Sequence, residues 1–364
     1  MDPFLPPSLP LPEGCINWGD LAPILGQAAR AIGTFNGHLR ALVNPGILVS
    51  PLARREAVLS ARIEGTVTTL DVILRYEGGA IKVEEQVDDI REIINYRKAL
   101  LAASHALEAR PLSRQLIREI HHVLLDSVRG EEKGRGAFRE EQNYVASHGE
   151  ISYVPPDFLH LADYLENFEA YLAYQERDPL IQTAIVHAQF ELIHPFLDGN
   201  GRVGRMLIPL FLHSCGVLFA PSFYLSEYFD SHRDQYITAL ENLSTRNAWQ
   251  EWIVFFLQAI SEQAESNLEK AAGVHGLYER MKRRVDDMHT TFAVRILDGL
   301  FYLGVFRSSQ FIEYTGIPED SVMRILRKLR KDNVLKTIQE KSGRQPAVMA
   351  FAELMNTVEG HEVI

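Results

Sequence analysis

The chain carries the stretch HPFLDGNGRVGR at residues 194–205, and this stretch decides how the sequence is interpreted. It places an imidazole, a carboxylate, two glycines around an amide and two guanidiniums close together. The apolar residues 184–193 before it and the residues from 202 onward predict two helices joined by this loop. Such a loop predicts phosphate-ester chemistry, since its groups can abstract a proton, hold a divalent cation and bind phosphates.

Proton transfer is predicted at His194 and metal binding at Asp198. Pro195 would end the preceding helix, so His194 lies at a helix end, where an imidazole can act as a general base near neutral pH. Asp198 offers a hard oxygen ligand, and one carboxylate combined with substrate phosphates is a normal arrangement for Mg²⁺.

Phosphate binding is predicted in the second half of the stretch. Gly199-Asn200-Gly201 allows the backbone to point successive N–H groups at one anion. Arg202 and Arg205 follow at the start of the next helix, where the helix dipole also favours negative charge. Because they are three residues apart, they share a helix face and can bind neighbouring phosphates.

A dinucleotide-binding fold is rejected, although residues 199–204 satisfy G-x-G-x-x-G. That fingerprint needs a preceding strand and an acidic residue roughly 20 positions later. Here the preceding segment has a helical period, and Tyr224 stands near the expected acidic position. The chain also contains no G-x-x-x-x-G-K-[ST], which excludes a P-loop kinase.

Composition indicates a globular protein with room for two or three domains. The 364 residues are 46% hydrophobic and carry a net charge of -11, so the whole molecule is a poor general nucleic-acid binder. The two cysteines, Cys15 and Cys215, favour a reducing cytosol and hence a cytoplasmic protein. The N-terminus lacks the features of a signal peptide, and residues 206–220 are too few to span a bilayer.

The hydrophobic pattern predicts a mainly α-helical chain. A loop with a hairpin around His148-Gly149 interrupts it over residues 129–156. The expected helices are Leu21–Leu42, Pro51–Glu64, Val87–Glu108, Leu112–Val128, Leu159–Leu172, Ile181–Ile193, Val203–Leu212, His232–Leu243 and Trp249–Leu268.

Residues 194–205 resemble, position by position, the Fic signature HxFx[DE]GNGRxxR. Three further segments are similar to parts of that family. Residues 134–139 resemble the segment before the target-docking flap, residues 148–156 the flap, and residues 224–228 the segment beside the adenine pocket. The resemblance implies a helical fold with a short β-hairpin flap and transfer of AMP from ATP to a hydroxyl of a protein target, itself included.

The resemblance also implies a role for each residue of the signature. His194 would deprotonate the target hydroxyl, and Asp198 would hold Mg²⁺ between the α- and β-phosphates. Asn200 and the amides of Gly199 and Gly201 would hold phosphate oxygens. The remaining nucleotide contacts would come from Arg202 on the β-phosphate, Arg205 on the γ-phosphate, Gly204 within the signature and Tyr228 near the adenine.

A second motif, SARIEG at residues 60–65, fits [ST]xxxE[GN], the Fic inhibitory helix. It lies N-terminal to the signature, where one Fic class carries it. The resemblance implies that Glu64 pairs with Arg205 in place of the γ-phosphate, while Ser60 helps to fix the helix. In some Fic proteins this glutamate instead positions water to remove AMP, and the sequence does not decide between the two directions.

The C-terminal segment resembles a winged helix-turn-helix. Residues 308–314 predict a first helix, 315–317 a turn and 318–331 a second helix, with a wing over residues 334–337 and 347–351 and its tip at Gly343-Arg344. Nine basic and five acidic residues between 307 and 344 give this part a charge of +4, so DNA is a partner to test through residues 307–345.

Three regions follow from these motifs: a helical N-terminal region over 1–110 with the inhibitory helix at about 51–65, a Fic catalytic core over 111–270, and the winged-helix-like domain over 280–364. The leading prediction is an autoinhibited adenylyltransferase that uses ATP and Mg²⁺. The alternatives are a nucleotide-sensing DNA-binding regulator and an enzyme that removes AMP with Glu64. No membrane partner is expected, and a homodimer stays open.

Overall fold

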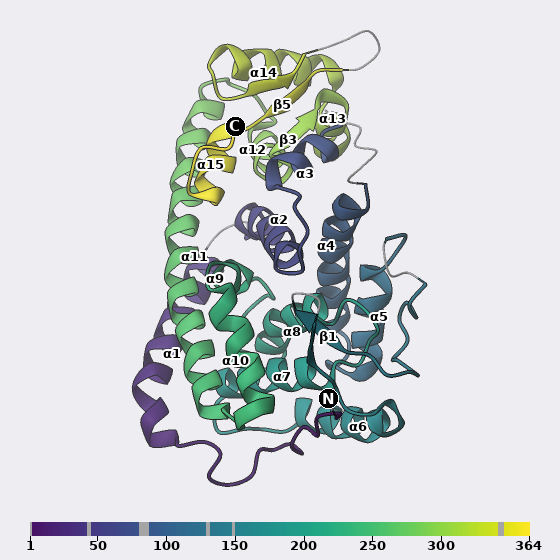
Figure 1. Cartoon of the computed structure of the whole chain (residues 1–364). Coiled ribbons are helices and arrows are strands. Elements are labelled where there is room, and N and C mark those ends of the chain that lie inside the picture. The colour runs from purple at the N-terminus through teal and green to yellow at the C-terminus, as the bar shows by residue number, and fades with distance from the viewer. Residues whose placement is uncertain (1, 42–44, 80–86, 129–131, 148–149, 341–345) are drawn as a thin grey trace. The chain divides into compact units, whose positions relative to one another are not determined.

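The computed structural model describes residues 2–41, 45–79, 87–128, 132–147, 150–340 and 346–364 (Figure 1). By its internal contacts the chain forms two compact units. Unit 1 comprises Met1–Gly37, Leu59–Thr66 and Arg91–Glu265. Unit 2 comprises His38–Val58, Val67–Ile90 and Ser266–Ile364. None of the helices in the described ranges is long and apolar enough to cross a membrane.

Unit 1 is built around two consecutive helices, α7 (Pro179–Ile193) and α8 (Asn200–Ser214), which pack against each other. Asp178 caps α7 by accepting from the N–H groups of Leu180 and Ile181, at 2.8 and 3.4 Å. Nearly every α7 side chain is buried, as expected for a central helix of a helical domain.

Shorter elements and further helices surround this pair within unit 1 (Figure 1). They are α5 (Arg114–Leu124), the strands β1 (Val145–Ser147) and β2 (Glu150–Tyr153), η1 (Phe158–His160), α6 (Leu161–Leu172), α9 (Ser226–Ser231), α10 (Arg233–Arg246), and most of α1 (Trp18–Ala41) and α4 (Val87–Leu107).

The predicted hairpin is present, because β1 pairs antiparallel with β2, with Val145 opposite Tyr153 and a register shift beside it. Its turn, His148-Gly149, lies outside the described residues, as does Gly130 of the loop before it. The N-terminal segment supports this hairpin, since the Phe4 N–H donates to the carbonyl of Val154 at 2.9 Å.

The helix α11 (Trp249–Asp286) is longer than expected. The sequence predicts its end near Leu268 and a domain boundary at 270–290, yet the helix continues without a break to Asp286. A buried apolar stripe continues beyond Leu268 at helical spacing, which explains why the helix extends to Asp286. Its residues are Val274, Leu277, Met281 and Val285. The first part of α11 belongs to unit 1 and the rest to unit 2.

Unit 2 combines helices with a three-stranded sheet of order β3-β5-β4, antiparallel throughout. Its elements are the first part of α2 (Gly46–Ile63), α3 (Leu70–Glu77), α12 (Ala293–Leu303), β3 (Val305–Arg307), α13 (Ser308–Thr315), α14 (Glu319–Lys331), β4 (Lys336–Gln339), β5 (Val348–Ala350) and α15 (Ala352–Glu359). Helices α13 and α14 lie where the sequence predicts them, whereas α3, α12, β3 and α15 were not anticipated. Gly343-Arg344 lies outside the described residues.

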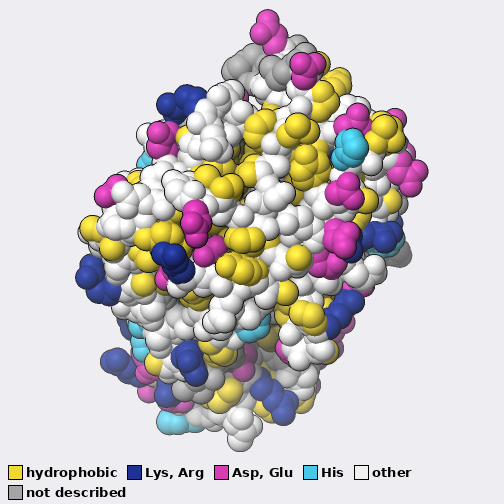
Figure 2. Space-filling view, turned by 90° about the horizontal axis from the view of Figure 1, so that it is seen from below, with side chains coloured by type: hydrophobic (Ala, Val, Ile, Leu, Met, Phe, Trp, Pro, Cys, Tyr) yellow, Lys and Arg dark blue, Asp and Glu magenta, His cyan; other side chains and the backbone are white. Residues whose placement is uncertain are grey.

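Gly316 makes the turn between α13 and α14, because it caps α13 with a φ of +60°. Helix α14 buries Val322, Ile325, Leu326 and Leu329 and leaves its basic side chains exposed. On the face of the molecule seen in Figure 2, charged side chains of both signs are interspersed with hydrophobic ones, as on an ordinary folded surface.

Candidate functional site

The loop between α7 and α8 is formed by two residues with positive φ. His194 ends α7 with a φ of +48°, and Gly199 begins α8 with a φ of +78°. Between them the Asn200 carboxamide closes the loop, accepting from the Phe196 N–H at 2.9 Å and donating to the Phe196 carbonyl at 2.7 Å. Asn200 is 3% exposed, so in this structure its carboxamide holds the loop.

Phe196 anchors the loop in the core. Its ring is fully buried and stacks on His121, with ring centroids 3.7 Å apart, and it also packs against Phe138. The His121 Nδ1 atom accepts from the Gly136 N–H at 2.9 Å, so in the neutral ring the proton is on Nε2, which donates to the Asp198 carbonyl at 3.0 Å. Burial lowers the His121 pKa to about 4, which keeps the ring neutral.

Side chains from the segment before the flap hold the His194 main chain. The Arg139 Nε donates to the His194 carbonyl at 3.1 Å and the Asn143 Nδ2 to the same oxygen at 3.3 Å. Arg139 also donates to the carbonyl of Pro156, at the far end of the hairpin. Its buried guanidinium therefore connects the signature loop to the segment that follows the β1–β2 hairpin.

A cavity of about 440 Å³ lies within unit 1 beside this loop. His194, Gly201, Arg205 and Glu64 line it together. The rest of the wall comes from residues next to Glu64, from the hairpin, from the last turn of α7 and from one side of α10. These residues are Ile63, Gly65, Val145, Ala146, Ser152, Tyr153, Glu191, Leu192, Arg233, Tyr236, Ile237, Leu240, Glu241 and Ser244.

Arg205 is held by the segment that the sequence singles out as inhibitory. Its NH2 atom donates to the Glu64 Oε1 at 2.7 Å and to the Ser60 carbonyl at 2.9 Å, and its Nε donates to the Ser60 Oγ at 2.8 Å. The Arg205 side chain is 2% exposed, whereas that of Glu64 is 41% exposed. A buried guanidinium is thus satisfied by residues from 60–64.

The end of α2 is fastened at two further points within unit 1. Arg62 forms an ion pair with Asp230 on α9, with its Nε 3.0 Å from the Asp230 Oδ1. The Arg233 NH2 donates to the Ile63 carbonyl at 3.2 Å. These contacts flank Glu64 and fix the direction from which its side chain reaches Arg205.

Asp198 and Arg202 form a separate charged group that does not line the cavity. The Arg202 NH2 lies 3.1 Å from the Asp198 Oδ1, its NH1 lies 3.2 Å from the Glu92 Oε2, and Arg202 is buried. The other Asp198 oxygen lies 3.3 Å from the Lys133 Nζ. Both carboxylate oxygens of Asp198 therefore have a cationic neighbour.

A magnesium ion fits this chemistry only with a nucleotide present. Among the residues that the structure describes, no three His, Cys, Asp or Glu side chains gather into a metal site. Asp198 supplies one carboxylate, so phosphate oxygens and water must complete the coordination, as is common for Mg²⁺.

Three titratable groups in the cavity have pKa values shifted by their surroundings. Burial lowers the pKa of His194 to about 4, so its imidazole is neutral at physiological pH. Burial acts to raise the pKa of Glu64, but attraction to Arg205 and Arg202 outweighs it and the net direction is downward. Burial raises the pKa of Glu191 to about 8, against the pull of Arg205. Glu64 is therefore ionised while Glu191 is protonated near neutral pH.

Tyr228 and Gly204 are two further predicted site residues that do not line the cavity. Tyr228 on α9 is 8% exposed, stacks on His232 with ring centroids 4.1 Å apart, and is not among the cavity-lining residues. Gly204 faces α7, where a Cβ would come within 2.1 Å of the Glu191 Oε1. In this structure Gly204 allows α7 and α8 to pack closely.

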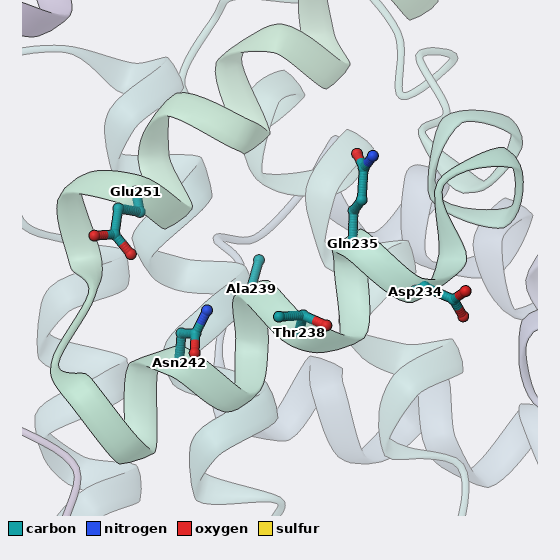
Figure 3. A pocket seen from close by; sticks show the side chains of 6 residues that line it. All are labelled: Asp234, Gln235, Thr238, Ala239, Asn242 and Glu251. Atoms are coloured by element: carbon teal, nitrogen blue, oxygen red, sulfur yellow. The ribbon is translucent and has the colours of Figure 1, made fainter.

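Sequence reasoning missed several residues of the site. Glu191 could have been found from the sequence, since it is the single carboxylate in the apolar run of residues 184–193. Nothing in the sequence pointed to the α10 residues Tyr236, Ile237 and Leu240, because only tertiary packing brings that helix to the cavity. The other side of α10 borders a separate hollow of about 320 Å³, lined by Asp234, Gln235, Thr238, Ala239, Asn242 and Glu251 (Figure 3).

Comparison with known protein families matches residues 23–105 to "Fic/DOC family N-terminal" and residues 111–212 to "Fic/DOC family". The two segments together span just over half of the 364 residues. The chain belongs to the Fic/DOC family. The family signature contains the cavity residues His194, Gly201 and Arg205, and the N-terminal match contains Glu64.

Curated relatives of this Fic chain include two animal proteins. "Protein adenylyltransferase Fic" of Drosophila grimshawi is 29% identical over 177 residues, covering 47% of this chain and 35% of the relative. "Protein adenylyltransferase fic-1" of Caenorhabditis elegans is 32% identical over 145 residues, covering 38% of this chain and 27% of the relative. The match thus spans about a third of the length of these relatives.

Solved structures share the Fic fold. A Fic family protein from Desulfovibrio desulfuricans superposes with a TM-score of 0.60 and 17% identity, covering 96% of this chain and 98% of that one. Fic-1 from Caenorhabditis elegans gives a TM-score of 0.53 and 19% identity, covering 71% of this chain and 75% of that one. The mainly helical fold expected from the sequence is therefore confirmed.

Proposed function

We propose that the protein is an autoinhibited adenylyltransferase that moves AMP from ATP to a hydroxyl group of a protein. The observation that carries this proposal is that His194, Gly201 and Arg205 of the signature line one cavity with Glu64, which binds Arg205 at 2.7 Å. Relatives that are named adenylyltransferases support the same class of reaction.

His194 is the general base of the proposed reaction. Its imidazole takes the proton from the target hydroxyl, whose oxygen then bonds to the α-phosphorus of ATP while the bond to the bridging oxygen breaks. Pyrophosphate leaves and AMP remains on the hydroxyl oxygen. Such chemistry depends mainly on positioning and charge stabilisation, and a general base contributes about 10²–10⁴-fold. The Arg139 and Asn143 contacts to the His194 carbonyl supply the positioning.

The start of α8 is the proposed phosphate site. Main-chain N–H groups at Gly199 and Gly201 lie at a helix N-terminus, where they and the helix dipole favour an anion. Arg205 becomes available to the terminal phosphate once Glu64 leaves it. Arg202 reaches phosphate only by exchanging its contacts with Asp198 and Glu92, and a phosphate contact from Asn200, Gly204 or Tyr228 stays a prediction.

Asp198 is the residue that would hold Mg²⁺, and the ion would neutralise charge on the phosphates. In the structure this carboxylate lies in ion-pair distance of Lys133 and Arg202. An ion that arrives with the nucleotide would therefore have to replace one of these two cations beside the Asp198 carboxylate.

Autoinhibition by Glu64 is part of the proposal. Its carboxylate occupies the guanidinium that the terminal phosphate needs, and its charge repels the nucleotide tail. Ser60 and the Arg62–Asp230 ion pair hold the segment in that position. The exposure of Glu64 toward the cavity also suits the alternative in which this carboxylate orients water to remove AMP from a modified protein.

A second candidate function concerns unit 2 by itself. The order of elements from α12 to β5 suits a winged helix-turn-helix, and a hollow of about 650 Å³ beside α14 is lined by Arg327, Arg330, Lys331, Asn333, Leu335, Lys336 and Thr337. This basic lining favours a polyanion such as DNA. At low salt the wild type is expected to bind a DNA duplex, and Arg327→Ala/Lys331→Ala is expected to lose that binding. A wild type that binds no duplex contradicts this second function.

The decisive experiment follows AMP incorporation from ATP labelled at the α-phosphate. Wild type, Glu64→Gly and Glu64→Gly/His194→Ala are compared in Mg²⁺, alone and with a cell lysate. Label in the Glu64→Gly sample that the double variant lacks is expected. Equal labelling by wild type and Glu64→Gly contradicts autoinhibition, and labelling that persists without His194 contradicts the assigned base. Loss of label from a pre-modified protein, dependent on Glu64, would favour AMP removal.

A further inference from the structure

The inference concerns Glu191, a carboxyl group in the cavity that the proposed reaction does not use. It lies on α7 one turn before His194, and its side chain fills the space beside Gly204. Its Oε1 atom is buried and has no hydrogen-bond partner among the residues that the structure describes. A buried polar atom without a partner destabilises the fold, so this one calls for an explanation.

Several titratable groups surround Glu191, and the proposed function has a nucleotide replace one of them, Glu64. The groups that line the cavity with it are Arg205 on α8, Glu64 after α2, His194 at the end of α7, and Arg233 and Tyr236 on α10. Arg205 attracts the charged form of Glu191, whereas Glu64 opposes it. Arg205 binds Glu64 and not Glu191, so the two carboxyl groups differ in their protonation.

Replacement of Glu64 by a nucleotide changes the charge around Glu191. A polyphosphate at Arg205 brings more negative charge than one carboxylate, and an ionised Glu191 beside it would be repelled. A protonated Glu191 would instead offer an O–H donor that a phosphate oxygen accepts.

We propose, on the basis of the adenylyltransferase function above, that Glu191 is a nucleotide-binding residue that acts as the carboxylic acid, so ATP binds together with a proton on this side chain. The proton comes from the solvent and returns to it when the nucleotide leaves, and no covalent bond changes. Ionised Glu191 is then a second carboxylate that competes for Arg205.

The test measures ATP binding by full-length Glu64→Gly protein with Mg²⁺, calorimetrically, at pH 7.0 and pH 9.5. Affinity falls by at least about tenfold between these values, because Glu191 must regain its proton. Calorimetry in buffers of different ionisation enthalpy detects the proton taken up. Adding Glu191→Gln keeps a neutral donor of the same size, so it abolishes both the fall in affinity and the proton uptake.

Two further variants serve as controls. One tests whether Glu191 acts as a hydrogen-bond donor or only fills space, and the other tests whether a different carboxyl group causes the pH dependence. Glu191→Met, which has no donor, weakens ATP binding about fivefold at pH 7.0 relative to Glu191→Gln. Glu241→Gln changes another carboxyl on the same cavity and retains the fall in affinity. Thermal unfolding checks that each variant is folded.

The outcomes distinguish this inference from the proposed function. Affinity that is independent of pH, or that falls equally in Glu191→Gln, overturns the role of Glu191 whatever the transfer activity. Proton-coupled ATP binding without AMP transfer at any pH overturns the proposed reaction and leaves Glu191 in place. Absence of ATP binding at every pH overturns both.

Discussion

Gly201 lies so close to Glu64 that a Cβ at position 201 would come within 2.3 Å of the Glu64 Oε1 atom and 3.0 Å of the Arg205 NH1. The glycine that the sequence assigns to phosphate binding therefore also makes room for the carboxylate that takes the place of phosphate. In the proposed mechanism the two functions share one space on the first turn of α8, so Glu64 and the nucleotide would exclude each other.

Gly201→Ala should destabilise the wild type more than Glu64→Gly, because the collision of the added methyl with the Glu64 carboxylate is lost in Glu64→Gly while its tight contact with Arg205 remains. A double-variant cycle of urea unfolding is expected to give a coupling free energy of about 0.5–3 kcal/mol. Additive effects of the two substitutions would show that the close approach does not affect stability.

Ser60→Ala should partly release inhibition, because the Arg205 Nε loses its acceptor at 2.8 Å while Glu64 remains. Leaving a buried donor unsatisfied costs about 1–3 kcal/mol of unfolding free energy. AMP transfer by Ser60→Ala is expected to lie between wild type and Glu64→Gly. Ser60→Thr, which keeps the hydroxyl, is the control, and equal transfer by Ser60→Ala and wild type would contradict the prediction.

The rate constant of AMP transfer should change little as the pH falls from 7.5 to 5.5. Burial lowers the His194 pKa to about 4, so the neutral base persists as the pH falls from 7.5 to 5.5. A histidine with the usual pKa of 6.5 would lose about tenfold by pH 5.5. The rate constant kcat of Glu64→Gly with saturating ATP is the measurement, and a tenfold fall would mean that His194 titrates normally.

Unfolding free energy should depend on the protonation of His121. Burial lowers its folded pKa to about 4, so below pH 6.5 the unfolded chain binds a proton that the folded chain does not. Stability is therefore lost as the pH falls from 6.5 toward 4, by about 1.4 kcal/mol per pH unit for this residue. His121→Gln should remove that part of the slope in urea titrations at pH 6.5, 5.5 and 4.5. An unchanged slope would contradict the neutral, buried imidazole.

Leu240→Trp should weaken ATP binding by Glu64→Gly, because Leu240 lines the 440 Å³ cavity and the larger ring takes up part of its volume. Ala239→Trp is the matched control, since Ala239 lines the separate hollow on the other side of α10 (Figure 3). Calorimetric titration with ATP distinguishes them. Equal affinity of the two variants would place the nucleotide outside this cavity.

The predictable parts of the fold were those with strong local signals. Helices such as α7 have a long apolar pattern, an aspartate cap and Pro195 after the end, and the loop glycines marked the turn into α8. Helix α3, by contrast, has only eight residues, and β3 has three, which is too short for periodicity to register. Their positions depend on tertiary contacts such as the one between the Arg307 NH2 and the Gly79 carbonyl, at 2.6 Å.

The parts of the candidate site that lie within the two sequence motifs were predictable. Residues His194, Gly201, Arg205 and Glu64 do line one cavity, although they come from segments far apart in the sequence. The contacts that Asn200 and Gly204 make in this structure could not be predicted from spacing, because hydrogen bonding to Phe196 and packing against Glu191 are tertiary facts, and a phosphate contact from either residue stays a prediction. Tyr228 fell outside the cavity because its ring packs on His232.

Residues 59–66, which carry Glu64, belong to unit 1, whereas the chain on both sides of them belongs to unit 2. Under the proposed autoinhibition, the segment that carries Glu64 is thus tethered at both ends to the molecule that it inhibits. Tethering by short linkers corresponds to an effective concentration on the order of millimolar, which does not change when the protein is diluted. In the proposed mechanism the degree of inhibition per molecule is therefore set by the competition between ATP and a fixed local carboxylate, and it would stay the same however much of the protein is made.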